Sequence, residues 1–347
     1  MMQVDVITGS RLHFGLICGT PESGWVYGGI GMMLRTPGWA LRLTHNGDSR
    51  SSDAATQDEI VGHQGSEPDA ALVVRIRELL SQLSTSMPRS WNLRLELLRE
   101  IPRHVGFGSG TQLALAVSVG LQTLCGPDVQ GNPEAFASRL KRAQRSSIGT
   151  IGFERGGFLI DFGKSQTTPS TESADRFQRI RIPEVWRFLT IRPLDRSGLC
   201  GESERQYFDR AATMPGQLVA NMDQIIRRGI QPALEQQNFD LFARSLSEYG
   251  NLAGTFYSSE QGGIFSDPSI AELAEFLARN SIVGTAQSSW GPAVCVPAQN
   301  AESAEQLRET ITNYATSHHY HWLVEVHRPQ NYGATIRIQT PESRQFF

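Results

Sequence analysis

A glycine-rich segment in the first third of the chain has the residue types of a phosphate-binding loop. It reads Gly106-Phe107-Gly108-Ser109-Gly110-Thr111-Gln112, and an almost wholly apolar run follows over residues 113–124. Glycine lets the backbone turn without steric hindrance and lets N–H groups approach a ligand closely. The apolar run predicts a buried helix, whose N-terminus would offer unpaired N–H donors to an anion. The segment therefore predicts a phosphorylated substrate.

Two better-known phosphate motifs are excluded for this loop. It lacks the Gly-Lys-Ser/Thr of a Walker A loop, and no strand ending in an acidic residue follows, as a dinucleotide fingerprint requires. The alternative is a glycine-rich turn that only feeds a buried helix. Pro102, Ser109, Thr111 and Gln112 favour the phosphate interpretation.

Basic side chains that could reach the anion lie in two places. Arg11 and His13 alternate along a predicted strand over 12–17, so they share one face and could bind a phosphate or a carboxylate. A solvated strand face is the alternative. His104 directly precedes the loop, where a solvated surface role is equally open.

Three further residues are predicted to be catalytic. Glu154 and Arg155 sit between glycines, which indicates tight backbone near a pocket, and Arg155 could fork onto a carboxylate or phosphate. An ion pair between these two side chains is the alternative. Asp161 is a candidate metal ligand or general base, or else a carboxylate that caps a turn.

Ser288 and Trp290 are expected to line a cleft. The indole of Trp290 could stack on an aromatic ligand there, or it could belong to the core.

Composition bounds the class of protein. The chain has 347 residues, enough for two domains, and a net charge of −3, which argues against a nucleic-acid or anionic-membrane partner. The four cysteines form no C-x-x-C pair, so a cytoplasmic setting with free thiols is expected. No apolar run reaches membrane-spanning length.

Four histidines at positions 318, 319, 321 and 327 suggest a metal cluster, but without a second ligand motif a surface strand is favoured.

The order of predicted elements indicates an α+β chain in two domains. We expect an N-terminal domain over 1–165, a linker over 166–184 and a C-terminal domain over 185–347. Strands are predicted at 4–8, 12–17, 39–44, 93–97 and 157–162, and helices at 72–83 and 132–145. In the second half, strands at 187–191, 282–287, 293–296, 323–326 and 335–338 bracket helical segments, which indicates a ferredoxin-like domain.

Several motifs together resemble the galactokinase–homoserine kinase–mevalonate kinase–phosphomevalonate kinase (GHMP) superfamily. Residues 102–111 resemble its P-x-x-x-G-L-G-S-S loop, residues 11–16 its first motif and residues 284–292 its C-terminal glycine-rich motif. The strings Gly-Phe-Glu-Arg-Gly-Gly at 152–157 and Gln-Ser-Ser-Trp-Gly-Pro at 287–292 are similar to one branch, the β-ribofuranosylaminobenzene 5′-phosphate synthases. The resemblance implies a GHMP-kinase-like two-domain fold.

The resemblance also implies a reaction. Phosphoribosyl pyrophosphate and 4-aminobenzoate would give a C-riboside phosphate, CO2 and pyrophosphate, early in tetrahydromethanopterin biosynthesis. Mg²⁺ is expected to shield the pyrophosphate, no pyridoxal phosphate is expected, and a homodimer is common for such enzymes. The alternatives are an ATP-dependent small-molecule kinase and a non-enzymatic protein that binds a phosphorylated ligand. Thr150 argues against the kinase, because it stands where superfamily kinases commonly carry a catalytic Asp.

Overall fold

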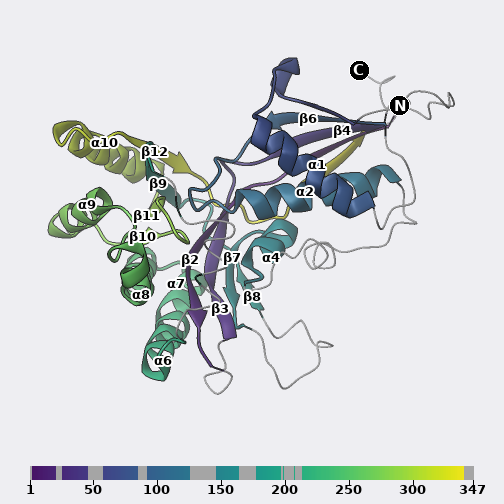
Figure 1. Ribbon diagram of the computed structural model, residues 1–347. Helices are drawn as coiled ribbons and strands as arrows, with labels where there is room; N and C mark the ends of the chain where they lie inside the picture. Colours follow the sequence, from purple (N-terminus) through teal and green to yellow (C-terminus); the bar gives the residue numbers. More distant parts are fainter. Residues whose placement is uncertain are drawn as a thin grey trace.

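A computed structural model describes most of the chain (Figure 1). The described residues are 2–20, 26–45, 58–84, 92–125, 146–163, 177–196, 198, 207 and 213–339. The predicted helix over 132–145 and most of the predicted linker lie outside them. So do residues 199–204, which contributed to the resemblance.

The first sheet has the strand order β13-β1-β4-β6-β5 and is antiparallel except where β5 pairs with β6. Alternating leucines at 93, 95 and 97 turn one face of β6 to the core, as their period of two predicts. Helices α1 and α2 lie on one side of this sheet (Figure 1). The strands are β1 (Gln3–Ile7), β4 (Ala40–His45), β5 (Glu59–Val61), β6 (Leu93–Arg99) and β13 (Thr335–Gln339).

The second sheet is antiparallel with the order β2-β3-β7-β8. It holds three predicted site residues, because β2 carries Arg11 and His13 and β7 ends at Asp161. Helix α4 packs against β7 and β3 and begins beside the end of β7. The strands are β2 (Ser10–Cys18), β3 (Val26–Leu34), β7 (Phe158–Asp161) and β8 (Phe177–Ile180).

The third sheet has the order β10-β11-β9-β12, all antiparallel. Taken in chain order these strands give the 4-1-3-2 arrangement of a ferredoxin-like domain, which confirms the predicted fold of the C-terminal part. Helix α10 packs on β9, β11 and β12. The strands are β9 (Arg187–Pro193), β10 (Ala286–Gln287), β11 (Val294–Ala298) and β12 (Trp322–His327).

The helices are set by apolar periodicity and by their caps. Asn238, Asp267 and Asn300 each accept a backbone N–H at the start of a helix, and Pro268 occupies the first turn of α9. None of the helices among the described residues is long and apolar enough to cross a bilayer. The helices are α1 (Ala70–Ser84), α2 (Ser109–Cys125), α4 (Ile148–Arg155), α6 (Gly216–Ile225), α7 (Gln231–Glu235), α8 (Phe239–Gln261), α9 (Pro268–Arg279) and α10 (Ala301–Ser317); π-helical residues 226–230 join α6 to α7, and η2 (His63–Gly65) is a 3₁₀ turn.

The last described strand returns to the beginning of the chain. Residues 335–339 of β13 pair antiparallel with residues 3–7 of β1 and form an edge of the first sheet. The sequence predicted this strand but assigned it to the C-terminal ferredoxin-like domain, which was wrong, because a period of two does not reveal which sheet a strand joins.

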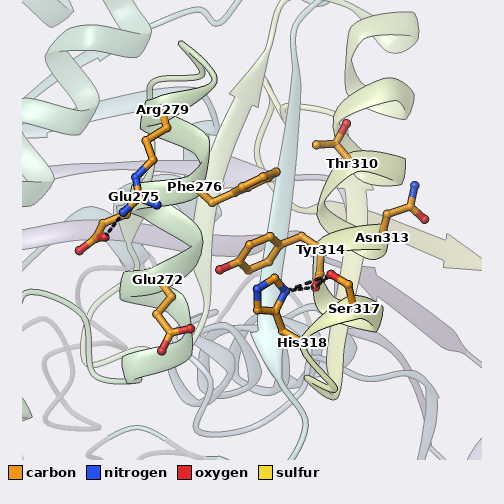
Figure 2. A pocket seen from close by; sticks show the side chains of 9 residues that line it. All are labelled: Glu272, Glu275, Phe276, Arg279, Thr310, Asn313, Tyr314, Ser317 and His318. Carbon is orange, nitrogen blue, oxygen red and sulfur yellow. Dashed lines mark hydrogen bonds and ion pairs between the residues drawn. The ribbon is translucent and has the colours of Figure 1, made fainter.

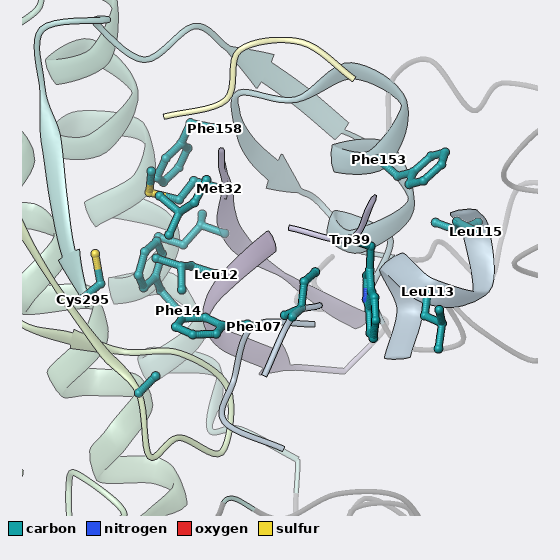
Figure 3. Close-up of a cluster of buried hydrophobic side chains, with 14 of the residues drawn as sticks. Leu12, Phe14, Met32, Trp39, Phe107, Leu113, Leu115, Phe153, Phe158 and Cys295 are labelled. Carbon is teal, nitrogen blue, oxygen red and sulfur yellow. The ribbon is translucent and has the colours of Figure 1, made fainter. Parts of the chain in front are cut away.

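One large buried cluster connects the sheets (Figure 3). It contains Phe14 of β2, Phe107 of the glycine-rich loop, Trp39 and much of α2. Phe107 is fully buried, so the loop is anchored to the core by its one aromatic side chain. The anchor fixes the glycines on either side of it.

His327 departs from the predicted surface strand of histidines. Its side chain is buried, and its two ring nitrogens lie 2.7 Å from Thr190 Oγ1 and 3.1 Å from Thr36 Oγ1. Burial lowers the pKa of His327 to about 4. The prediction was wrong for this residue because hydroxyl partners on two other elements satisfy both nitrogens.

Candidate anion-binding site

The glycine-rich loop has the backbone that its sequence predicts. Gly106 and Gly108 have φ of +98° and +67°, in the left-handed region that favours glycine. A Cβ on Gly106 would lie 2.5 Å from the carbonyl oxygen of Ser288, and one on Gly108 would lie 3.0 Å from Arg11 Nε. Both glycines are therefore required by conformation and by space.

Two helix starts converge beside this loop. Helix α2 begins at Ser109, and α4 begins at Ile148. A Cβ on Gly149 would lie 3.1 Å from Thr111 Cγ2 and 3.7 Å from Arg11 Cδ, so both first turns and the arginine meet. First-turn N–H groups lack intrahelical partners and carry the positive end of the dipole. We call Arg11, Gly108, Ser109, Gly110 and Gly149 the anion cradle.

Arg11 is fixed by the loop that it faces. Its backbone N–H donates to the carbonyl oxygen of Phe107 at 3.0 Å, and its side chain packs between Gly108 and Gly149. The sequence placed Arg11 on a strand face that could be solvated or functional. The structure brings it to the predicted loop, where a guanidinium favours an anion.

His13 lies on the same strand and is buried. Its Nε2 is 3.1 Å from Ser146 Oγ, and its Nδ1 accepts the N–H of Gly15 at 3.4 Å. Burial first and the charge of Arg11 second lower the pKa of His13 to about 3. The imidazole is therefore neutral at physiological pH, with its hydrogen on Nε2.

Ser288 joins the C-terminal glycine-rich motif to the loop. Its hydroxyl accepts the backbone N–H of His13 at 3.1 Å and donates to the carbonyl oxygen of Gly106 at 2.7 Å. The N–H of Ser289 donates to the carbonyl oxygen of His13 at 2.6 Å. Ser288 is completely buried, so it holds the site together rather than facing a ligand.

Three predicted phosphate-binding residues make hydrogen bonds within the protein. The backbone N–H groups of Thr111 and Gln112 donate to Gly108 within the helix start. The Gln112 side chain is fully buried and donates to the carbonyl oxygen of Gly149 at 2.8 Å, so it ties α2 to α4. His104 is exposed, and its carbonyl oxygen accepts the N–H of Gly198 at 2.8 Å. For Gln112, the predicted ligand contact gives way to a structural one.

Asp161 lies at the site as a capping carboxylate. Its two oxygens accept the N–H of Ser147 at 2.6 Å and that of Gly163 at 3.0 Å, and the side chain is buried. The sequence left open a metal ligand, a base or a turn cap. These contacts are those of the cap, which stabilises the start of α4.

Glu154 and Arg155 are not brought to the cradle. They end α4, about 10 Å along the helix from its start. Glu154 Oε1 and Arg155 Nε are 3.5 Å apart, both side chains are well exposed, and the guanidinium lies over the ring of Phe177. The neighbouring glycines serve packing, since a Cβ on Gly156 would lie 2.3 Å from the carbonyl oxygen of Tyr332. The geometry favours the ion pair over the predicted catalytic roles.

Trp290 belongs to an aromatic cluster. Its ring meets Tyr257 and Tyr207 edge to face at 5.2 and 4.8 Å between centroids, and it is 6% exposed. Of the two roles left open by the sequence, the structure gives it the one in the core.

A groove of about 820 Å³ lies elsewhere, between α9 and α10 (Figure 2). Phe276 and Tyr314 stack inside it at 4.4 Å, and His318 stacks on Tyr314 at 4.0 Å. Figure 2 shows that its side chains come from these two helices and from His318, which directly follows α10. None of the predicted site residues lines it, so we place the chemistry at the cradle.

The sequence reasoning missed Ser146 and Gly149 as site residues. Ser146 accepts from the His13 ring and from the N–H of Ile148, and Gly149 is the point where α2 and α4 touch. The available signal was Ser146-Ser147 before Ile148-Gly149, which has the form of a helix start with a small residue inside it.

The fold and the glycine-rich loop define the chain as one with the GHMP kinase fold. Residues 71–153 match the family described as GHMP kinases N terminal domain. Mevalonate diphosphate decarboxylase from Staphylococcus aureus superposes with a TM-score of 0.65, at 10% identity over 97% of this chain and 98% of that one. Homoserine kinase from Cytophaga hutchinsonii gives 0.60, at 12% identity over 96% and 97%.

Among individual proteins, the chain is similar to enzymes named beta-ribofuranosylphenol 5′-phosphate synthase. It is 27% identical to the one from Methanothermobacter thermautotrophicus, over 85% of this chain and 88% of the relative. The Archaeoglobus fulgidus enzyme is 25% identical over 95% and 98%. The resemblance stated from the sequence motifs is thereby confirmed.

Proposed function

We propose that the chain is a decarboxylating phosphoribosyltransferase that joins phosphoribosyl pyrophosphate to a para-substituted benzoate. The observation that carries the proposal is the anion cradle, combined with similarity to the synthases over nearly the whole chain. A pyrophosphate is a double phosphate, and two helix starts with an arginine between them offer it more than one donor group.

The proposed reaction balances without an external oxidant or base. The bond between C1 of the ribose and the pyrophosphate oxygen breaks, and pyrophosphate leaves with the electron pair. The ring carbon that bears the carboxylate attacks C1, and the para substituent stabilises the resulting ring cation. The bond to the carboxylate then breaks, its electrons return to the ring, and CO2 leaves. Donors aimed at the departing pyrophosphate stabilise the charge that develops there.

Mg²⁺ is part of the proposal. The described residues contain no group of three metal-ligating side chains. Mg²⁺ is often bound chiefly by substrate phosphates and water, and we propose that the pyrophosphate and water bind it here. The ion would neutralise charge on the leaving group.

The para substituent distinguishes two versions of the substrate. The sequence resemblance suggested 4-aminobenzoate, whereas the name of the related enzymes specifies a phenol product. An amino and a hydroxyl group both donate electrons to the ring, so either supports the chemistry. The expected homodimer and cytoplasmic setting are further parts of the proposal, and light scattering tests the first.

The test is release of labelled CO2 from carboxyl-labelled 4-aminobenzoate and, separately, 4-hydroxybenzoate, with Mg²⁺ and phosphoribosyl pyrophosphate. We expect release that requires phosphoribosyl pyrophosphate, and the faster ring identifies the substrate. Ser109→Ala with Thr111→Ala should weaken binding of phosphoribosyl pyrophosphate more than that of the benzoate. Release of no CO2, with ATP consumed in a parallel tube, would refute the proposal and favour a kinase.

The kinase alternative has less support from the geometry. Thr150 is buried and carries no carboxylate at the position where superfamily kinases commonly have Asp. Asp161 accepts the N–H of Ser147 at the start of α4 and the N–H of Gly163 just after β7. The kinases among the structural neighbours share only the fold, at 12–13% identity.

A further inference from the structure

Ser146 lies two residues before α4, next to the N-cap Ser147, and is partly exposed. Its oxygen lies 3.1 Å from His13 Nε2 and accepts the N–H of Ile148 at 3.3 Å. A hydroxyl oxygen accepts two hydrogen bonds and donates one. With both acceptor positions occupied, the hydroxyl hydrogen is directed away from the histidine and the helix.

The His13 contact has a defined direction. Nδ1 accepts the N–H of Gly15, which leaves the ring hydrogen on Nε2, where it points at Ser146 Oγ. A hydroxyl that accepts from an N–H becomes a stronger donor through polarisation. His13 is held in turn by Ser288 and Ser289, which bond its backbone N–H and carbonyl oxygen. The backbone of His13 is therefore held on both sides, and its ring bonds Ser146 and Gly15.

The surroundings of Ser146 favour an anion. Its helix begins at the point where Gly149 meets Thr111 and the side chain of Arg11. Among the described residues, the charged groups there are Arg11 on β2 and Asp161 on β7, whose carboxylate accepts from Ser147 and Gly163 and offsets the dipole of α4. Arg11 and the start of α2 supply the positive potential.

We propose that Ser146 donates its hydroxyl hydrogen to the pyrophosphate group of the substrate, and that His13 is the positioning residue that orients this hydroxyl. The identity of the anion rests on the proposed function. His13 does not transfer a proton in this arrangement. It acts through Ser146, and Ser146 extends the anion cradle from α2 to the start of α4.

Inorganic pyrophosphate with Mg²⁺ is the probe, measured by calorimetry on the full chain. Ser146→Ala should weaken its binding roughly tenfold, the range of one hydrogen bond to a charged group. Ser146→Thr, which keeps the hydroxyl, should restore most of the affinity. Ser303→Ala is the matched control, because its hydroxyl also accepts a backbone N–H at a helix start, that of α10. Unchanged affinity in Ser146→Ala, or no pyrophosphate binding by the wild type, would overturn the proposal.

The positioning role needs a second comparison. His13→Leu should weaken pyrophosphate binding in the wild type but not in Ser146→Ala, because its effect passes through that hydroxyl. Equal losses in both backgrounds would overturn the role of His13. If His13→Leu does not fold, His13→Gln, which keeps an N–H at similar reach, should bind nearly as the wild type does. A loss in that variant as large as in Ser146→Ala overturns the role.

Kinetics separate this inference from the proposed function. If CO2 is released, Ser146→Ala should raise KM for phosphoribosyl pyrophosphate and leave KM for the benzoate unchanged. An increase confined to the benzoate would overturn the inference while leaving the proposed reaction intact. Ser146-dependent pyrophosphate binding without any CO2 release would support the inference and refute the proposed reaction.

Discussion

The hydroxyl of Ser288 donates to the carbonyl oxygen of Gly106, 182 positions away in the sequence, at 2.7 Å. Through the same oxygen it accepts the N–H of His13. One small side chain therefore aligns the loop, the strand that carries Arg11 and the C-terminal motif. Any ligand bound in the anion cradle depends on this alignment.

Ser288→Ala should lower the free energy of unfolding by about 1–3 kcal/mol, because it leaves a buried N–H and a buried carbonyl without their partner. Urea unfolding measures the change. Ser317→Ala, whose hydroxyl is exposed on α10, serves as control and should change little. A Ser288→Ala protein as stable as the wild type would contradict the alignment.

Gly106→Ala should abolish pyrophosphate binding and destabilise the loop. The new Cβ would approach a backbone oxygen to 2.5 Å, and the φ of +98° is strained for alanine. Gly216→Ala is the matched control, since a Cβ there meets nothing within 4 Å. Calorimetric binding and thermal unfolding report the two effects separately, and wild-type behaviour in both would refute the role of the loop.

Arg11→Gln and Arg155→Ala should behave oppositely. Loss of the Arg11 charge should weaken pyrophosphate binding by roughly tenfold or more, because that guanidinium lies in the cradle. Arg155→Ala should leave binding and CO2 release nearly unchanged, since its ion pair with Glu154 is largely exposed. A large loss of activity in a folded Arg155→Ala protein would restore the catalytic role predicted from the sequence.

Stability should fall as the pH is lowered from about 7 to about 5. His13 and His327 have pKa values lowered to about 3 and about 4 when folded, whereas an unfolded histidine titrates near 6.5. The unfolded state therefore takes up protons first, and each histidine should remove about 2 kcal/mol over this range. His327→Gln should flatten the dependence by about half, while exposed His319→Gln should not. A slope unchanged by His327→Gln would show that this histidine is not buried neutral.

Much of the fold could be predicted because local signals were consistent. The leucine period of two in β6, the helical spacing in α1 and the apolar run of α2 each set an element that the structure contains. The long-range pairings could not be read in this way. Neither the return of β13 to β1 nor the burial of His327 between two threonines leaves a periodic trace.

The candidate site, like the fold, could be predicted where a local sequence signal exists and not where the contact is long-range. The glycines, two of which have positive φ, predicted the loop, and strand alternation predicted that Arg11 and His13 share one face of a strand. Residues near glycines were harder to judge, because the glycines beside Glu154 and Arg155 serve packing: Gly152 against Met33, and Gly156 against Gln330 and Tyr332. Gln112 resembled a ligand contact in sequence, but its buried side chain joins two helices.

The pairing of β13 with β1 also orders events during synthesis. The ribosome releases residues 3–7 long before residues 335–339, yet these strands share an edge of one sheet. Until the late strand emerges, β1 has an open edge on the side that β13 will cover, which is a hazard for association with other nascent chains. Completion of the first sheet therefore waits for residues 335–339, and the ferredoxin-like part must be made before the sheet beside the anion cradle is finished.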